Sequence, residues 1–219
     1  MDFSSVATIV LWAVPVVFAI TLHEAAHGYV ARLFGDQTAW ILGRVTANPI
    51  KHIDPVGTIL VPALLLITAK LFGGPVFVFG WAKPVPVNFN NLRHPKRDML
   101  WVAGAGPTAN FLMAIGWGLL LKAAFPDGAL ASNGLVEMAF AGIQVNLMLM
   151  ALNLLPILPL DGGRIAVSLL PHSLATGYAR LEPFGFMIVV LLLATGVLGR
   201  LMQPILELGE YILTALLGL

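Results

Sequence analysis

Residues 3–35 read FSSVATIVLWAVPVVFAITLHEAAHGYVARLFG, and this stretch decides the class of fold. From Phe3 to Leu22 no residue is charged, and the apolar pattern continues as far as Gly35. A helix needs about 20 mostly apolar residues to cross the hydrocarbon core of a bilayer. The stretch therefore predicts one long membrane helix over residues 5–34. A signal peptide begins with a basic run, and no such run precedes this helix. We therefore expect the helix to stay in the mature protein.

The composition of the whole chain is that of a membrane protein. Of its 219 residues, 58% are hydrophobic and 11% are charged, and the mean hydropathy is +0.90. A soluble domain usually carries about 25% charged residues, so the polar groups here are too few to cover a surface in water. We expect an all-α polytopic membrane protein, in which residues 1–219 form a single transmembrane helix bundle in the lipid bilayer.

Net charge and cysteine content exclude one class of partner and two kinds of cysteine site. A net charge of +1 leaves no basic surplus to neutralise phosphates, so nucleic acid is not an expected partner. The chain has no cysteine, which removes disulfides and thiolate metal sites. Any zinc must therefore be held by histidine and carboxylate side chains. The sequence predicts no particular oligomeric state.

Apolar runs elsewhere in the chain predict the remaining helices. Their expected ranges are residues 98–123, 135–155, 184–199 and 201–218.

Residues 56–90 differ from these runs. Residues 56–72 form a short apolar block interrupted by Pro62 and Lys70, and residues 75–88 are rich in β-branched, aromatic and proline residues. We expect a re-entrant segment here, with a short membrane-associated β-hairpin whose edge could pair with an unwound substrate strand. Whether 56–72 enters and returns or crosses the membrane fully stays open.

Basic residues indicate the orientation in the membrane. Most lysines and arginines fall within residues 36–55, 83–97 and 161–183, whereas residues 124–134 contain none. An excess of Lys and Arg marks the cytoplasmic side. We therefore expect a multi-pass protein of the cell membrane with its N-terminus outside and its active site toward the cytoplasm.

The motif His23-Glu24-Ala25-Ala26-His27 carries the chemistry. On a helix, positions i and i+4 lie on one face, so both imidazoles can reach the same metal ion. Ionisable groups inside a membrane helix cost about 2.5–3.5 kcal/mol each on insertion scales and are usually functional. We interpret His23 and His27 as ligands of one Zn²⁺ per chain, and Glu24 as the group that acts on water at that ion.

A catalytic zinc site takes three protein ligands and keeps one position for water. Asp161 is the best candidate for the third ligand, because it ends a long uncharged run and is followed by Gly162 and Gly163. Alternatively, Asp161 serves as the N-cap of the helix that follows.

Three motifs occur in order along the chain: HEAAH at 23–27, GAGPTAN at 104–110 and NLLPILPLDGG at 153–163. Together they resemble the site-2 protease family of intramembrane zinc metalloproteases. The chain leaves no room for a PDZ domain and is similar to the short prokaryotic form of that family.

The resemblance implies a three-helix catalytic core, zinc held by His23, His27 and Asp161, and Glu24 as general acid and base. It also implies that the substrates are transmembrane proteins, cleaved at peptide bonds in or near their membrane segments. Asn153 matches a family asparagine thought to position the substrate or the tetrahedral intermediate.

Two other functions could use the same residues: a membrane zinc transporter, or a zinc-binding membrane protein without proteolytic activity.

Four further residues have weaker interpretations. Asn110 could bond a neighbouring helix or touch substrate, Gly104 and Gly106 could permit close helix packing, and His52 could be a cavity residue or a solvated loop residue.

Overall fold

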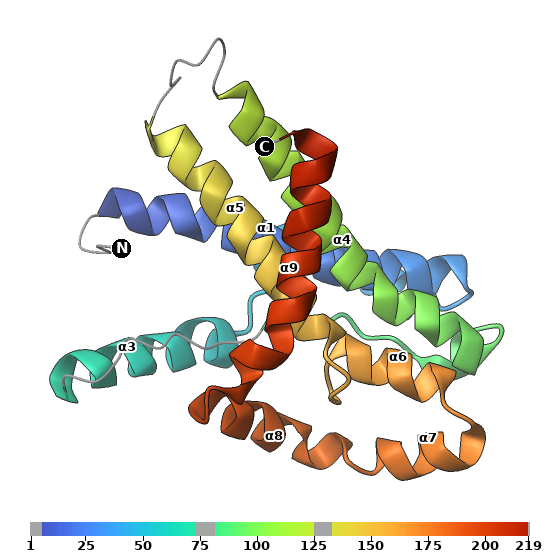
Figure 1. Cartoon of the computed structure of the whole chain (residues 1–219). Helices are drawn as coiled ribbons and strands as arrows, with labels where there is room; N and C mark the ends of the chain where they lie inside the picture. Colours follow the sequence, from blue (N-terminus) through green and yellow to red (C-terminus); the bar gives the residue numbers. More distant parts are fainter. Residues whose placement is uncertain (1–5, 73–81, 125–132, 219) are drawn as a thin grey trace.

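The computed structural model describes residues 6–72, 82–124 and 133–218, and within these ranges its regular structure is entirely helical (Figure 1). The long helices are α1 (Val6–Leu33), α4 (Pro95–Ala123), α5 (Asn133–Leu154) and α9 (Val197–Leu217). The shorter ones are α2 (Thr38–Ile41), α3 (Val61–Phe72), α6 (Asp161–Leu169), α7 (His172–Ala179) and α8 (Glu182–Ala194), with single turns η1 (Pro49–Lys51), η2 (Pro55–Leu60) and η3 (Phe89–Asn91). The expectation of an all-α chain is confirmed for the described residues.

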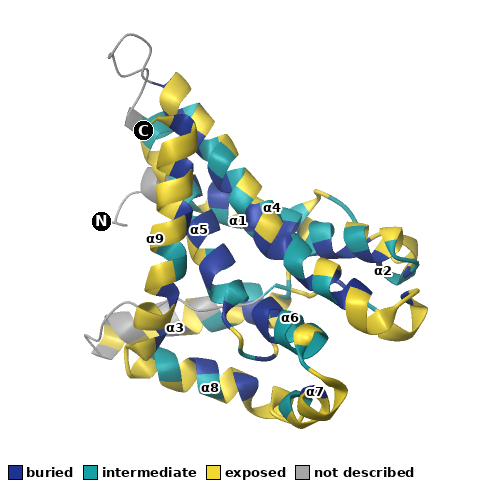
Figure 2. Ribbon diagram, turned by 45° about the vertical axis from the view of Figure 1, so that its right-hand side comes forward, coloured by how far each residue is buried: buried dark blue, intermediate teal, exposed yellow. Residues whose placement is uncertain are grey.

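Helices α1, α4 and α5 pack against one another and form the centre of the molecule, and α9 lies along α4 and α5 (Figure 1). Their contact faces are apolar; Ala114, Leu147 and Leu213 belong to one of the buried clusters. Buried residues follow the inward faces of these helices, and exposed residues cover the outward faces (Figure 2). Large apolar side chains such as Trp101 and Leu112 stand on the outer surface, as expected where lipid replaces water.

Two helices in the described part of the chain are long and apolar enough to cross a bilayer. They are α4 and residues Gly134–Leu154 of α5. Helices α7 and α8 would supply a third crossing if this pair, bent by 66°, is one broken span. These apolar helices agree with a membrane location.

The break between the last two helices falls earlier than expected. A helix was predicted over 184–199, but α8 ends at Ala194 and α9 begins at Val197. The reason is Gly196, whose φ of 72° lies in the left-handed region that favours glycine and interrupts the helix.

The β-hairpin predicted within residues 56–90 is not supported. Residues 55–72 are helical, in η2 and α3, and residues 82–88 form no strand; the first half of the predicted hairpin lies outside the described residues. One physical reason is that Pro84 and Pro86 have no backbone N–H to donate. In addition, the N–H groups of Lys83, Val85 and Asn88 donate to acceptors that are not part of a strand ladder.

The carboxylate of Asp36, just after the end of α1, is hydrogen-bonded to residues within the segment 88–91. Asp36 is fully buried. Its Oδ1 accepts from the amide of Thr38 at 3.0 Å and from Nδ2 of Asn91 at 3.1 Å, and its Oδ2 accepts from the amide of Asn88 at 2.7 Å. Burial alone raises the pKa of Asp36, but the hydrogen bonds from Thr38, Asn88 and Asn91 outweigh it and lower that pKa below its ordinary value.

Asp36→Asn should lower the free energy of unfolding at pH 7 by about 1–3 kcal/mol, because an amide presents fewer acceptors to the buried donors. Since the folded-state pKa is lowered, the stabilisation by Asp36 is complete above the ordinary pKa and is lost as pH falls through the folded-state value. Thermal unfolding in detergent at pH 7 and near pH 3 should show the difference between wild type and variant shrinking in acid. An equal difference at both pH values would contradict this role.

Candidate metal centre

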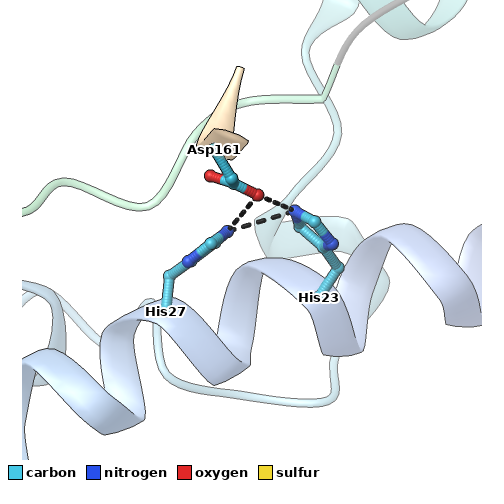
Figure 3. Close-up of side chains that lie close together, drawn as sticks. All are labelled: His23, His27 and Asp161. Atoms are coloured by element: carbon cyan, nitrogen blue, oxygen red, sulfur yellow. Dashed lines mark hydrogen bonds and ion pairs between the residues drawn. The ribbon is translucent and has the colours of Figure 1, made fainter. Parts of the chain in front are cut away.

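Three ligand-type atoms meet where the start of α6 reaches α1 (Figure 3). Nε2 of His23 lies 3.1 Å from Nε2 of His27. Oδ2 of Asp161 lies 3.2 Å from the first nitrogen and 3.3 Å from the second. All three residues are less than a tenth exposed. The three predicted ligands therefore form one compact group that could hold a single metal ion.

The histidines reach this group because α1 presents them, one turn apart, to α4. Opposite them α4 has Gly106, and a Cβ on this residue would lie 2.5 Å from Cε1 and 2.6 Å from Nε2 of His23. Gly106 thus makes room for the imidazoles. Gly104, by contrast, faces open space. Close packing explains the first of these glycines but not the second.

Asp161 is delivered by the first turn of α6, which packs against α4. The chain before this helix folds back closely: a Cβ at Gly163 would lie 2.5 Å from the nitrogen of Leu158 and 2.7 Å from the carbonyl carbon of Ile157. The N-cap position belongs to Leu160, and no side chain caps the helix. The alternative role of Asp161 as an N-cap is therefore not supported.

Hydrogen bonds on the far side of each imidazole fix its tautomer. Nδ1 of His27 lies 2.7 Å from the carbonyl oxygen of Val102, which can only accept, so this nitrogen carries the proton. Nδ1 of His23 lies 2.5 Å from Oδ1 of Asn110. The amide nitrogen of Asn110 donates in turn to Oδ1 of Asn146 at 2.9 Å, which leaves its oxygen as the acceptor toward His23. In the neutral imidazoles both Nε2 atoms consequently carry lone pairs.

Three electron-pair donors thus face one another inside the protein. Oδ2 of Asp161 is buried and accepts no hydrogen bond. A tetrahedral zinc ion with bonds of about 2.0–2.1 Å separates its ligand atoms by about 3.3 Å, close to the three distances here. Hydrogen bonds from the second nitrogen of a ligating imidazole are the usual support of such ligands. The residues therefore fit zinc in both donor chemistry and spacing.

Glu24 follows His23 in the sequence, and its carboxylate is hydrogen-bonded by a residue that lies outside α1. Its Oε2 accepts a hydrogen bond of 2.7 Å from the backbone amide of Val85. Glu24 is half-buried. The segment predicted as a hairpin edge thus contacts the residue predicted to act on water.

Among the other candidates, Asn153 lies on α5, and its Nδ2 donates to the carbonyl of Leu149 at 3.0 Å within the same helix. Asn110, for which two roles were open, is fully buried and bonded to His23. Asn146 was not anticipated. Its position as an asparagine inside an uncharged run could have marked it as a candidate, but the sequence does not indicate that it faces Asn110.

Comparison with known proteins places the chain among peptidases. Residues 118–195 match the model of "Peptidase family M50", a range that contains Asn153 and Asp161. Two relatives carry the name "Putative zinc metalloprotease". YwhC of Bacillus subtilis is 40% identical over 201 residues, 90% of this chain and 86% of the relative. Rip2 of Mycolicibacterium smegmatis is 34% identical over 187 residues, 83% of this chain and 66% of the relative. No solved structure matches.

Gly106→Ala should weaken zinc retention by about 10–100-fold, the usual effect of disturbing the support of metal ligands, because the methyl group would displace the imidazoles. Zinc per chain after dialysis against graded chelator measures this effect. Gly104→Ala is the matched control on the same helix, since its methyl group meets open space, and it should retain zinc like wild type. Equal retention by both variants would show that Gly106 is not needed for the site.

Proposed function

The chain belongs to peptidase family M50, and from this premise we propose that it is a zinc-dependent intramembrane endopeptidase that cleaves membrane proteins in or near their transmembrane segments. The family and its zinc metalloprotease relatives confirm the class of enzyme expected from the sequence. In the proposed site His23, His27 and Asp161 hold one Zn²⁺, and Glu24 is the general base.

One observation carries the assignment of the ligands. Three acceptor atoms lie 3.1–3.3 Å apart, and in the neutral imidazoles the protons are at Nδ1 and not at the facing Nε2 atoms. Such an arrangement in a buried site is unfavourable unless a cation joins the lone pairs.

The residues around this site can carry out hydrolysis. A zinc ion bound there supplies Lewis-acid activation of the attacking water and of the scissile carbonyl. Glu24 accepts the proton that the water loses as it attacks. The carboxylic acid then gives this proton to the nitrogen of the departing amine as the C–N bond breaks. Asn153 is the proposed donor to the oxyanion, since an amide nitrogen has two hydrogens and the bond to Leu149 uses one.

The packing of the long helices supports the proposed orientation. Helices α4 and α5 are consecutive candidate spans, so the start of α4 and the end of α5 emerge on one side of the membrane. Asp161 follows α5 closely and meets the C-terminal half of α1. We place this side in the cytoplasm because the basic segments 36–55, 83–97 and 161–183 flank it. Residues 1–219 then act as one multi-pass domain.

A role in zinc transport is less favoured. A transit pathway needs ligands spread across the membrane, whereas the potential metal ligands gather in one group in the described part of the chain. The peptidase family also argues for hydrolysis.

Glu24→Gln should strongly reduce cleavage without removing the metal. The amide cannot accept the proton, so cleavage of a transmembrane substrate in detergent should fall about 100-fold to 10,000-fold, while zinc per chain stays at the wild-type level. The double variant His23→Ala, His27→Ala is the control that should lose both zinc and activity. A Glu24→Gln protein that cuts at wild-type rate would remove this residue from the mechanism.

The topology can be tested with single cysteines, because the chain has none of its own. Cysteines at positions 48 and 94 should react with an impermeant thiol reagent only from the cytoplasmic side, and one at position 130 only from outside. Reaction of position 94 from outside would mean that residues 56–72 cross the membrane fully, and the re-entrant arrangement would be wrong.

A further inference from the structure

Residues 83–85 connect two buried polar residues to Glu24. Among these three residues only Lys83 and Val85 have amides, since residue 84 is proline. The amide of Val85 donates to Oε2 of Glu24 at 2.7 Å, and the amide of Lys83 donates to the carbonyl of His52 at 2.9 Å. Both backbone N–H groups of this segment are thus hydrogen-bonded.

Arg44 holds the acceptors of the same segment. Its Nη2 donates to the carbonyl of Lys83 at 2.8 Å and to that of Pro84 at 3.4 Å. Only 8% of Arg44 is exposed. A buried guanidinium is costly unless it is well bonded, and the partners it has are the two carbonyls immediately before Val85. This charge therefore fixes the peptide group whose N–H reaches Glu24.

His52 supports the other side of the segment. It is 3% exposed, and its Nε2 lies 3.0 Å from the carbonyl oxygen of Thr46. This bond anchors the turn η1, whose C-cap is His52. The backbone carbonyl of His52 then accepts from Lys83. His52 is accordingly a buried structural histidine and not a solvated loop residue.

The side chain of Val85 is also fixed by packing. It is 8% exposed, and a Cβ on Gly28 of α1 would come within 3.0 Å of its Cγ1. Gly28 lies one turn after Glu24, so Val85 packs on the face of α1 that carries the carboxylate. Packing and hydrogen bonding both bring this one amide to Glu24.

Resting on the proposed function, we propose that the backbone amide of Val85 is the positioning donor for Glu24, and that Arg44 and His52 are positioning residues that act through residues 83–84. A glutamate has three rotatable side-chain bonds, and a general base must stay within hydrogen-bond reach of the proton it takes. One hydrogen bond to Oε2 restricts these rotations, and Oε1 would then be the atom that accepts the proton of the water. The fixed amide thus acts on catalysis without touching substrate.

Val85→Pro tests this directly, because it removes the one N–H in a segment that already accommodates proline at 84 and 86. We expect kcat to fall at least tenfold with KM changed less than threefold and zinc per chain at the wild-type level. Val85→Ala keeps the amide and should retain most of the activity. Val87→Pro, which places the same ring two residues further on, is the matched control and should also stay active. Arg44→Gln should reproduce the loss in kcat in milder form.

Hydrogen exchange measures the contact without any substrate. Val85 lies between two prolines, so mass spectrometry of a fragment that covers residues 83–86 reports on its amide alone, because no other internal residue of that fragment has a backbone N–H. In the zinc-loaded protein this amide should exchange at least tenfold faster in Glu24→Ala than in wild type.

Two results would overturn the proposal: equal exchange in wild type and Glu24→Ala, or full kcat in Val85→Pro. A wild-type protein that cleaves no peptide bond would instead overturn the proposed function, and the exchange result would still decide whether Val85 holds Glu24.

Discussion

Burial of three hydrogen-bond acceptors against one another is the constraint on which the site depends. His23, His27 and Asp161 point their lone pairs at a common centre, and the first two have committed their protons elsewhere. In water such atoms would each bind solvent, but here they are shielded from it. A divalent cation at this centre would offset the repulsion, and binding of the metal would then be coupled to the cohesion of α1 with α6.

Helix α4 is the template that makes this arrangement possible. Val102, Gly106 and Asn110 recur every four residues along it and supply a carbonyl acceptor, a space and an amide acceptor to the histidines. The histidines of α1 have the same four-residue spacing and lie against this row of α4, where Gly106 leaves space for the imidazoles. Asn146 extends the support to α5. Each helix of the central group therefore contributes to holding the imidazoles.

The segment 82–88 shows how polar side chains override a local preference. Its β-branched residues and prolines favour an extended chain, and the sequence suggests a hairpin. A hairpin needs a ladder of backbone bonds, whereas here the donors go to Glu24, Asp36 and the carbonyl of His52. These acceptors lie more than 30 residues away along the chain, and periodicity over a short window carries no information about them.

The sequence by itself indicated the membrane class, the long helices and the pair His23 and His27 as candidate zinc ligands, because these depend on composition, on runs of apolar residues and on the i, i+4 spacing of a single helix. The predicted positions of helix ends, such as the break at Gly196, were less accurate. The sequence pattern does not distinguish a glycine in the left-handed conformation from one inside a helix. Tertiary structure alone decided which groups support the site. The carbonyl of Val102, the amide of Val85 and the pair Asn110 and Asn146 act through space, and their roles arise only when helices far apart in the chain are packed together.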